Sequence, residues 1–321
     1  MIRKSFAGTI LPVLLLPGFL LSHQISFAQL KDTVIVDKKV ITLSEVVVNS
    51  RINVPYFIER VKNDSSFYKA FKNLRVLRFT SLNDIEILDK KNQVRASLQS
   101  RTRQEVWDSC RHTNILSEEV KGDIYDDRRQ FNYYTAALYA SLFFAYDTIC
   151  GENNIVRGTE LEIRGKSGMA KHREQLKMLF FNPGKPIPGL PFIGSKLAIF
   201  DANMAELYDY DIDEEQKAGE PCYIFKVKAK PDLNAGQKDR IVIDEMTTWF
   251  NERTFEVIAR DYSMSYHAML YDFDVQMEVE MSRFGELQVP HLIRYSGNWK
   301  VIFKKRERAV FTATVFDFAT P

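Results

Sequence analysis

Cysteine and dense positive charge are both scarce in this chain of 321 residues. The three cysteines are Cys110, Cys150 and Cys222, and an odd number in a chain of this size does not indicate a disulfide scaffold. No two of them are spaced like metal ligands, so we expect each to be a buried free thiol, although an exported protein can form a disulfide. No run of basic residues forms the cationic stripe that binds nucleic acid, and we expect no nucleic-acid partner.

Recognisable catalytic motifs are missing as well. The chain has no Gly-x-Ser-x-Gly elbow and no His-Glu-x-x-His motif. Gly165-Lys166-Ser167 ends like a phosphate-binding loop, but Glu160 stands where its first glycine should be. We therefore predict a protein that is not an enzyme and carries no cofactor. A hydrolase with an unrecognised site is the weakest alternative.

The N-terminus has the parts of a secretory signal peptide, and its apolar run is short for a membrane span. Arg3 and Lys4 precede the apolar run from Thr9 to Ser22, and a small-x-small site ends at Ala28. Cleavage after about Ala28 removes two of 44 basic residues and leaves 42 against 42 acidic residues. We expect a nearly neutral mature protein, periplasmic or secreted, without a transmembrane span.

Residues 271–281 alternate strictly between apolar and polar side chains. The apolar set is Tyr271, Phe273, Val275, Met277, Val279 and Met281. Side chains alternate across a strand, so one face meets the interior and the other meets water, as in an antiparallel sheet. Further strands are expected at 81–88, 93–101, 222–229, 240–250, 255–264, 288–295, 298–306 and 309–318. Ser296-Gly297-Asn298 would form a hairpin between two of them.

Helical spacing of apolar residues predicts an amphipathic helix from Tyr56 to Leu74. Phe131 to Tyr146 is apolar on nearly all sides and predicts a buried helix, and Lys171 to Phe181 could form a short one. Residues 106–128 are expected to be loop or short helix. Together these patterns predict an α+β fold, mostly antiparallel β, in which a curved half-barrel meander packs over one or two helices. The expected organisation is a signal peptide (1–28), an extended arm (29–54) and a single domain (55–321).

Two segments carry a resemblance to a known family. The strand Gly219 to Phe225 is followed by Met246-Thr247-Thr248-Trp249-Phe250-Asn251, and the next strand runs back beside it. This succession of strand, tryptophan, turn and strand resembles the LolA/LolB lipoprotein carriers and their relatives. The resemblance implies a half-barrel closed over a helix around an apolar cavity, with an arginine inside the cavity. The sequence does not show which arginine that would be.

The expected function is therefore a non-catalytic envelope binding protein of a Gram-negative cell that holds an apolar ligand, a lipid or a lipidated protein. Candidates for the cavity lining are Phe143, Phe144, Trp249, Phe273 and Val275. The loop 183–194 is stiffened by prolines and would act as a lid through Ile187, Leu190, Phe192 and Ile193. The alternative is that these same side chains pack a dry core and no cavity exists.

The N-terminal arm suggests a second possible function. Leu43-Ser44-Glu45-Val46-Val47-Val48 resembles the segment that precedes the plug of TonB-linked outer-membrane receptors. The protein would then be a periplasmic scaffold or sensor that docks an outer-membrane or envelope protein by strand addition through Glu45, Val46, Val47 and Val48. An ordinary edge strand is the other interpretation of this segment.

One acidic cluster has the spacing of calcium ligands. Asp209, Asp211, Asp213 and Glu220 match the first, third, fifth and twelfth positions of a calcium-binding loop. The sixth position is Glu214 rather than the glycine that the sharp turn needs, and an acidic solvated turn is the alternative. We expect no bound metal and keep this cluster as a weak calcium candidate.

Overall fold

The computed structural model describes residues 52–156, 177–187, 192–268, 271–301 and 305–321, positions 175 and 190, and the backbone of three short strands between residues 33 and 48. Residues Lys31–Pro321 form one compact unit. The predicted signal peptide lies outside the described residues. Within the described part of the chain, no helix is both long and apolar enough to cross a membrane.

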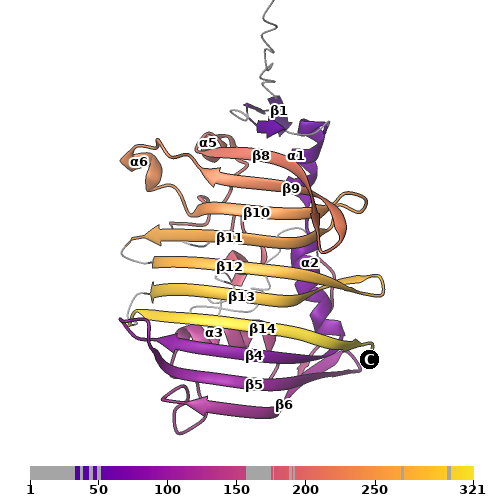
Figure 1. The fold of residues 1–321 in the computed structure, drawn as a ribbon, viewed down its shortest axis with the longest axis vertical. Coiled ribbons are helices and arrows are strands. Elements are labelled where there is room, and N and C mark those ends of the chain that lie inside the picture. Colours follow the sequence, from indigo (N-terminus) through magenta and orange to yellow (C-terminus); the bar gives the residue numbers. More distant parts are fainter. Residues whose placement is uncertain are drawn as a thin grey trace, which may run out of the picture. The chain divides into compact units, whose positions relative to one another are not determined.

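A twelve-stranded open sheet is the main element of this unit (Figure 1). Its order is β3-β8-β9-β10-β11-β12-β13-β14-β4-β5-β6-β7, so a long meander from β8 to β14 is followed by the earlier hairpins. The strands are β3 (Val46–Val48), β8 (Tyr208–Lys217), β9 (Glu220–Ala229), β10 (Ile243–Asn251), β11 (Val257–His267), β12 (Tyr271–Phe284), β13 (Leu287–Val301), β14 (Glu307–Ala319), β4 (Arg78–Leu88), β5 (Val94–Trp107), β6 (Cys110–Lys121) and β7 (Ile149–Cys150). The sheet is curved, and its neighbouring strands are antiparallel except for β3 beside β8, which confirms the predicted antiparallel half-barrel class.

A separate two-stranded antiparallel sheet joins β1 (Thr33–Val36) and β2 (Lys39–Thr42). The helices are α1 (Val54–Asn63), α2 (Ser66–Asn73), the 3-10 turn η1 (Leu74–Val76), α3 (Tyr134–Phe143), α5 (Ala202–Ala205) and α6 (Ala235–Lys238). Residues 177–181 are also helical.

The helix predicted from Tyr56 to Leu74 is two helices. Asn53 caps α1 by accepting a hydrogen bond from the Tyr56 N–H, and Pro55 lies in the first turn, where its missing N–H costs nothing. At Asp64 the backbone becomes extended, and its carboxylate accepts from the Ser66 N–H at the start of α2. The apolar periodicity continues across this break, so it could not reveal the interruption.

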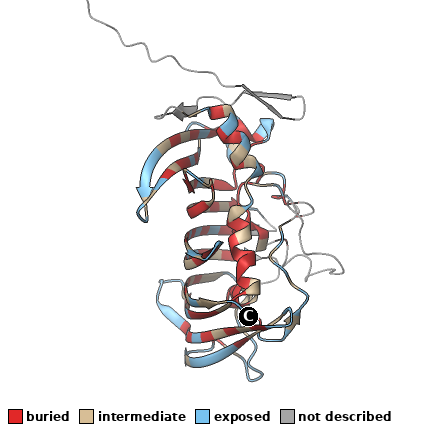
Figure 2. Cartoon of the chain, turned by 90° about the vertical axis from the view of Figure 1, so that its right-hand side faces the viewer, coloured by how far each residue is buried: buried red, intermediate tan, exposed pale blue. Residues whose placement is uncertain are grey.

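The strand β12 alternates as expected. Phe273, Val275, Met277, Val279 and Met281 are buried, whereas the intervening carboxylates are exposed or half-buried. Figure 2 shows the same alternation of buried and exposed positions along neighbouring strands. We call the face that carries the buried set the inner face, and the face that carries Asp272 and Asp274 the outer face.

Helices cover the inner face through aromatic contacts. The ring of Tyr139 in α3 stacks on Phe311 of β14, with centroids 5.2 Å apart and an interplanar angle of 7°. The carboxylate of Glu307, at the start of β14, accepts from the Tyr134 and Thr135 N–H groups at 2.9 and 2.7 Å. A negative charge at the N-terminus of a helix is favourable, so this contact attaches α3 to the sheet.

Three local predictions were wrong. Ser296-Gly297-Asn298 is not a hairpin but the middle of β13, where Gly297 pairs with Val275 and Ala309. The Tyr295 side chain lies over Gly297, so a Cβ on residue 297 would overlap the ring and hydroxyl of Tyr295. Glycine is therefore required at this position because it leaves room for the tyrosine, not because the chain turns. Residues 110–121 form β6 rather than loop or helix, and residues 208–217 form β8 rather than an acidic turn.

Candidate functional site

The predicted lining residues do not surround a single cavity. Phe143, Phe144, Phe273 and Val275 are buried, and Phe273 stacks on Trp299 with ring centroids 4.6 Å apart. Trp249 lies on the outer face, because its neighbour Thr248 pairs with the inner-face residue Arg260 and side chains alternate along β10. Lys217 Nζ lies 4.5 Å from the centroid of the Trp249 ring. Of the five, Phe143 borders a cavity on the inner face.

The predicted lid packs against the core. Ile187, Leu190 and Ile193 are buried in the main hydrophobic cluster, whereas Phe192 is 69% exposed. A Cβ on Gly194 would lie 2.8 Å from the Leu190 carbonyl oxygen and closer still to that of Ile187, so the loop closes tightly on itself. These contacts place three of the four side chains as core rather than as a mobile cover.

The predicted docking strand is part of the protein's own sheet. Val46, Val47 and Val48 form β3, which pairs in parallel with Tyr210, Asp211 and Ile212 of β8. Glu45 lies outside the described residues. β3 stands at the end of the described sheet order, so its pairing with β8 uses one of its two edges, as expected of an ordinary edge strand.

The calcium candidate does not form a loop. Asp209, Asp211 and Asp213 occupy alternate positions of the extended strand β8, and Glu220 begins β9. The Asn251 side-chain amide donates to the Glu220 carboxylate. In the part of the chain that the structure describes, no group of three or more His, Cys, Asp or Glu side chains is placed to hold a metal ion.

The strongest candidate site is a cavity of 220 Å³ on the inner face, which we call the basic pocket. It lies where α2, η1, α3 and residues 177–181 meet strands β4 to β7. Its lining residues are Tyr68, Phe71, Lys72, Leu74, Arg75, Phe79, Gln104, Arg111, Ser141, Leu142, Phe143, Ile149, Glu152, Lys177 and Phe181. The pocket therefore combines an aromatic and aliphatic wall with a cluster of charges.

Aromatic contacts hold the apolar wall together. The Phe71 ring lies 4.7 Å from Phe181 and 6.3 Å from Phe143, measured between centroids, and Tyr68 lies 5.9 Å from Phe181. All four rings are buried. They come from α2, α3 and the helical residues 177–181, so the wall exists only after these separate segments pack together.

Arg111 and Glu152 form the polar centre of the pocket. Arg111 Nε donates to Glu152 Oε2 at 2.5 Å, and one terminal nitrogen donates to Gln104 Oε1 at 3.1 Å. Arg75 lies 3.4 Å from the other Glu152 oxygen. These groups are only partly exposed, so the dielectric around them is lower than in water and each charge acts more strongly on its neighbours.

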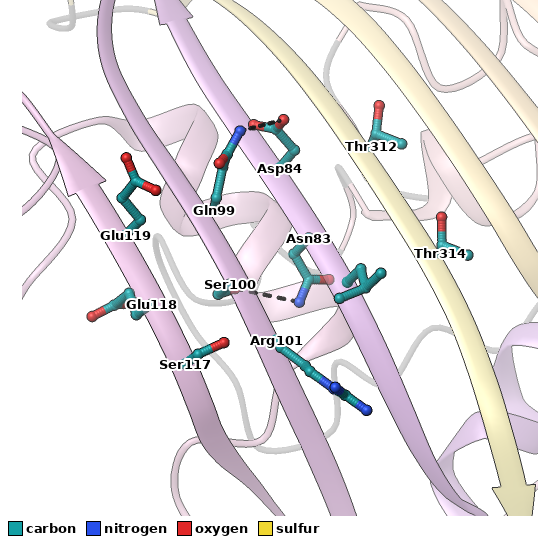
Figure 3. A pocket seen from close by; sticks show the side chains of 11 residues that line it. Asn83, Asp84, Gln99, Ser100, Arg101, Ser117, Glu118, Glu119, Thr312 and Thr314 are labelled. Carbon is teal, nitrogen blue, oxygen red and sulfur yellow. Dashed lines mark hydrogen bonds between the residues drawn. The ribbon is translucent and has the colours of Figure 1, made fainter.

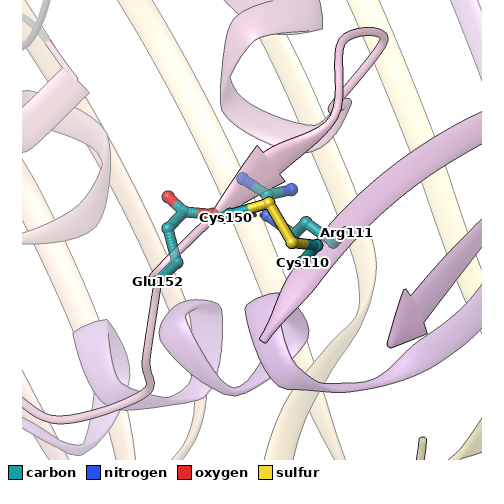
Figure 4. Close-up of a disulfide and its surroundings, with 4 residues drawn as sticks. All are labelled: Cys110, Arg111, Cys150 and Glu152. Atoms are coloured by element: carbon teal, nitrogen blue, oxygen red, sulfur yellow. Dashed lines mark hydrogen bonds and ion pairs between the residues drawn. A yellow bond between two sulfur atoms is a disulfide. The ribbon is translucent and has the colours of Figure 1, made fainter. Parts of the chain in front are cut away.

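A disulfide holds this ion pair in place (Figure 4). Cys110 and Cys150 are bonded to each other. Cys110 directly precedes Arg111, and Cys150 lies two residues before Glu152. The bond joins β6 to the short strand β7. The expectation of free thiols was therefore wrong for Cys110 and Cys150, because tertiary pairing of distant strands brings them together, and right for Cys222, which is free and buried.

The basic residues of α2 and η1 share one helical face. Lys69, Lys72 and Arg75 are spaced three residues apart, and Lys72 is only 8% exposed. Burial, together with the nearby charge of Lys72, lowers the pKa of Lys69. Lys69 Nζ donates to the Asn154 carbonyl oxygen at 2.5 Å, and Lys177 Nζ donates to the Ser141 carbonyl oxygen at 3.1 Å. This face was not among the sites predicted from the sequence, although the three-residue spacing of cations along an amphipathic helix was a usable signal.

Arg260 is a second buried cation on the inner face. Its Nε donates to Thr248 Oγ1 at 2.9 Å, and its guanidinium lies 4.4 Å from the centroid of the Phe67 ring. Burial lowers its pKa, and the nearby Asp64 acts in the opposite direction. Arg260 is therefore buried on the inner face, between Thr248 and the Phe67 ring.

A larger hollow of 600 Å³ lies across β14, β4, β5 and β6, and its lining side chains are shown in Figure 3. Asp84, Glu118 and Glu119 contribute acidic groups and Arg101 a basic one. Gln99 Nε2 donates to Asp84 Oδ2 at 3.1 Å. All of its lining residues except Leu82 have polar or charged side chains, and Leu82 is half exposed, so it offers no wall of buried aromatic rings like that of the basic pocket.

Comparisons with known proteins find only distant structural similarity. No model of a protein family matches the chain, and no curated protein matches it. Similar solved structures include a DUF1329 family protein from Desulfovibrio piger ATCC 29098, with 11% identity, a TM-score of 0.26, and coverage of 79% of this chain and 91% of that one. A putative outer membrane lipoprotein-sorting protein domain from Vibrio parahaemolyticus has 9% identity, a TM-score of 0.26, and coverage of 82% and 90%. Lipovitellin has 8% identity, a TM-score of 0.25, and coverage of 76% and 25%.

The sorting domain is of the kind that the strand and tryptophan pattern resembles, but a TM-score of 0.26 carries no argument about the fold of this chain. None of these three structures is a TonB-linked receptor. At TM-scores this low, the similarity carries no argument about ligand or activity. The function has to be argued from the residues of this chain.

Proposed function

We propose that the protein is a non-catalytic binding protein of the cell envelope that holds an apolar ligand, a lipid or a lipidated protein, on the inner face of the sheet. The observation that carries this proposal is the basic pocket, a cavity of 220 Å³ walled by aromatic rings where three helical segments meet the sheet. Burial of each methylene group of a ligand in such a cavity contributes about 0.8 kcal/mol.

The size of the pocket defines how a ligand would enter. Pockets for drug-sized ligands occupy roughly 300–1,000 Å³, so 220 Å³ is small for a complete acyl chain. A long chain needs space that the Phe143 and Phe181 side chains occupy. We therefore expect these rings to turn aside, or α3 to move from the sheet, when such a ligand binds.

The proposed location has two supports. The N-terminal pattern of a signal peptide is that of an exported protein. The Cys110–Cys150 disulfide suits an oxidising compartment such as the periplasm. A scaffold that docks a partner through Val46–Val48 is the alternative function, and the pairing of β3 with β8 uses only one edge of that terminal strand.

Mass spectrometry of an organic extract of the purified mature protein tests the proposal, with binding of a fluorescent fatty acid as a second measurement. Leu142→Trp adds volume at the pocket wall and is expected to reduce both the extracted lipid and the bound probe. Leu116→Trp, at an exposed position of β6, is the matched control and should leave both unchanged. Absence of lipid from the extract together with absence of probe binding would overturn the proposal.

A further inference from the structure

We infer that the Cys110–Cys150 disulfide is a redox-controlled latch of the basic pocket, which a dithiol reductant opens by releasing residues 146–153 from β6. The inference rests on the proposed function, because it concerns access to the pocket that holds the ligand. Figure 4 shows the bond joining the strand that carries Cys110 to the short strand that carries Cys150. The effect of reduction depends on how else residues 146–153, which we call the flap, are attached to the protein.

The flap is anchored at both ends by contacts that do not involve the disulfide. Before it, the Thr113 N–H donates to the Ala145 carbonyl oxygen at 2.7 Å, and the Ala145 N–H donates to Thr113 Oγ1 at 3.0 Å. After it, the Asn154 side-chain amide donates to Asn73 Oδ1 on α2 at 2.9 Å. The flap would therefore stay attached at its two ends after reduction, and its middle would be the part that moves.

The middle of the flap has only a short pairing with the sheet edge. β7 consists of Ile149–Cys150 and pairs with Cys110 and Arg111 of β6. Beside it, the Gly151 N–H donates to the Ser109 carbonyl oxygen at 2.9 Å. Two strands alone are marginally stable in water even when they are longer than this. The covalent bond is therefore the strongest restraint that keeps the middle of the flap against β6.

Two residues of the flap, Ile149 and Glu152, line the basic pocket. Glu152 also joins the flap to β6 through its ion pair with Arg111, and the two side chains are 21% and 12% exposed. An ion pair that water reaches opens far more readily than a covalent bond. Movement of the flap away from β6 would carry both lining residues with it and open the pocket on that side.

The bond is open to a reductant. Cys150 is exposed and Cys110 partly exposed, and the neighbouring residues Tyr146, Asp147 and Gly151 are exposed as well. Exposed disulfides are those that thiols reach and exchange with most easily. An attacking thiolate can therefore approach the Cys150 sulfur without prior unfolding of the protein.

Reduction by a dithiol is a balanced exchange of two electrons. One thiolate of the reductant bonds to Cys150 Sγ, the bond between the two protein sulfurs breaks, and Cys110 leaves as a thiolate. The second thiol of the reductant then attacks the mixed disulfide, and Cys150 leaves in turn. The reductant ends as a disulfide, and the protons from its two thiols pass to the two cysteines. Oxidation by a disulfide of the same class reverses these steps and closes the latch.

The rate at which a bound probe leaves the pocket tests the inference. The purified mature protein is loaded with a fluorescent fatty acid, and release into excess unlabelled fatty acid is followed with and without dithiothreitol. We expect release to be at least about tenfold faster from the reduced protein, because changes at a binding site act mainly on the dissociation rate. Cys222→Ala should respond to dithiothreitol as the parent does, since Cys222 is a free thiol outside the latch.

Hydrogen exchange measured on the same samples locates the movement. We expect reduction to raise the exchange of backbone amides in residues 146–153 and to leave strands β8 to β13 unchanged. The combined Cys110→Ser and Cys150→Ser variant should release the probe at the rate of the reduced parent, whether or not dithiothreitol is present.

Equal release rates from oxidised and reduced parent protein would overturn the inference and leave the proposed function standing. Faster exchange throughout the sheet on reduction would identify the bond as a structural cross-link, which also overturns it, as would a bond that excess dithiothreitol fails to reduce in the folded protein. Failure of the oxidised protein to bind the probe would refute the proposed function and the inference together.

Discussion

Exchange of both Cys110 and Cys150 for serine should lower the free energy of unfolding by about 4 kcal/mol. The bond joins positions separated by 40 residues, and its removal lets the unfolded chain adopt conformations that the cross-link forbids. For a loop of that length the unfolded chain gains about 13 cal/mol/K, which is about 4 kcal/mol at room temperature. The loop includes β6 and α3, so one wall of the basic pocket is affected.

Urea unfolding followed by tryptophan fluorescence measures this change. The parent protein in reductant should unfold at the same urea concentration as the double variant, because both then lack the bond. Cys222→Ala is the control, since Cys222 is a free thiol and its variant should still respond to reductant as the parent does.

The same double variant should bind the fluorescent fatty acid more weakly than the parent, because the segments that carry Arg111, Phe143 and Glu152 at the pocket are no longer tied together. Equal unfolding midpoints for parent and double variant, with mass spectrometry showing the bond intact in the parent, would refute the reasoning.

Three further predictions concern the inner face, the attachment of α3 and the pH dependence of stability. Gly297→Val should destabilise the protein by about 1–3 kcal/mol in thermal unfolding, because the Tyr295 ring must leave its packed position; an unchanged melting temperature would contradict this. Glu307→Gln should cost about 1 kcal/mol of stability by weakening the charge at the N-terminus of α3, and Glu286→Gln in an exposed turn serves as its control. Burial, helped by neighbouring carboxylates, raises the pKa of Asp261 from 3.8 to about 6, so the folded state binds this proton more tightly than the unfolded state does. The stability that the protonated Asp261 contributes is present below about pH 4 and is lost as the pH rises through about 6. Asp261→Asn should therefore raise the melting temperature near pH 7.5 and leave it unchanged near pH 3. Equal changes in melting temperature at both pH values would exclude this cause.

Local patterns were sufficient where neighbouring residues alone decide the structure. The alternation of residues 271–281 defined β12 and its buried face, because the period of a strand is a property of the backbone itself. The apolar run around α3 likewise indicated a buried helix. The same reasoning failed at Gly297, since a glycine that makes room for Tyr295 has the same sequence signal as a glycine in a turn.

The candidate site was less accessible to sequence reasoning. Trp249 was expected in the cavity because it is large and apolar, but its position in the β10 alternation places it on the outer face. Arg111 and Lys177 are far apart along the chain, and nothing local distinguishes them from other cations. Only the face of α2 that carries Lys69 and Lys72 could have been recognised in advance.

By itself the sequence determined the antiparallel class of the sheet, the buried helix above it and the separation of its two faces, because these depend on periodic burial within single segments. The tertiary structure alone decided the basic pocket, the Cys110–Cys150 bond and the position of Arg260 on the inner face. The physical reason is that charge clusters and covalent pairings depend on distances between segments, and those distances exist only once β6, β7, α2 and α3 have packed against one another.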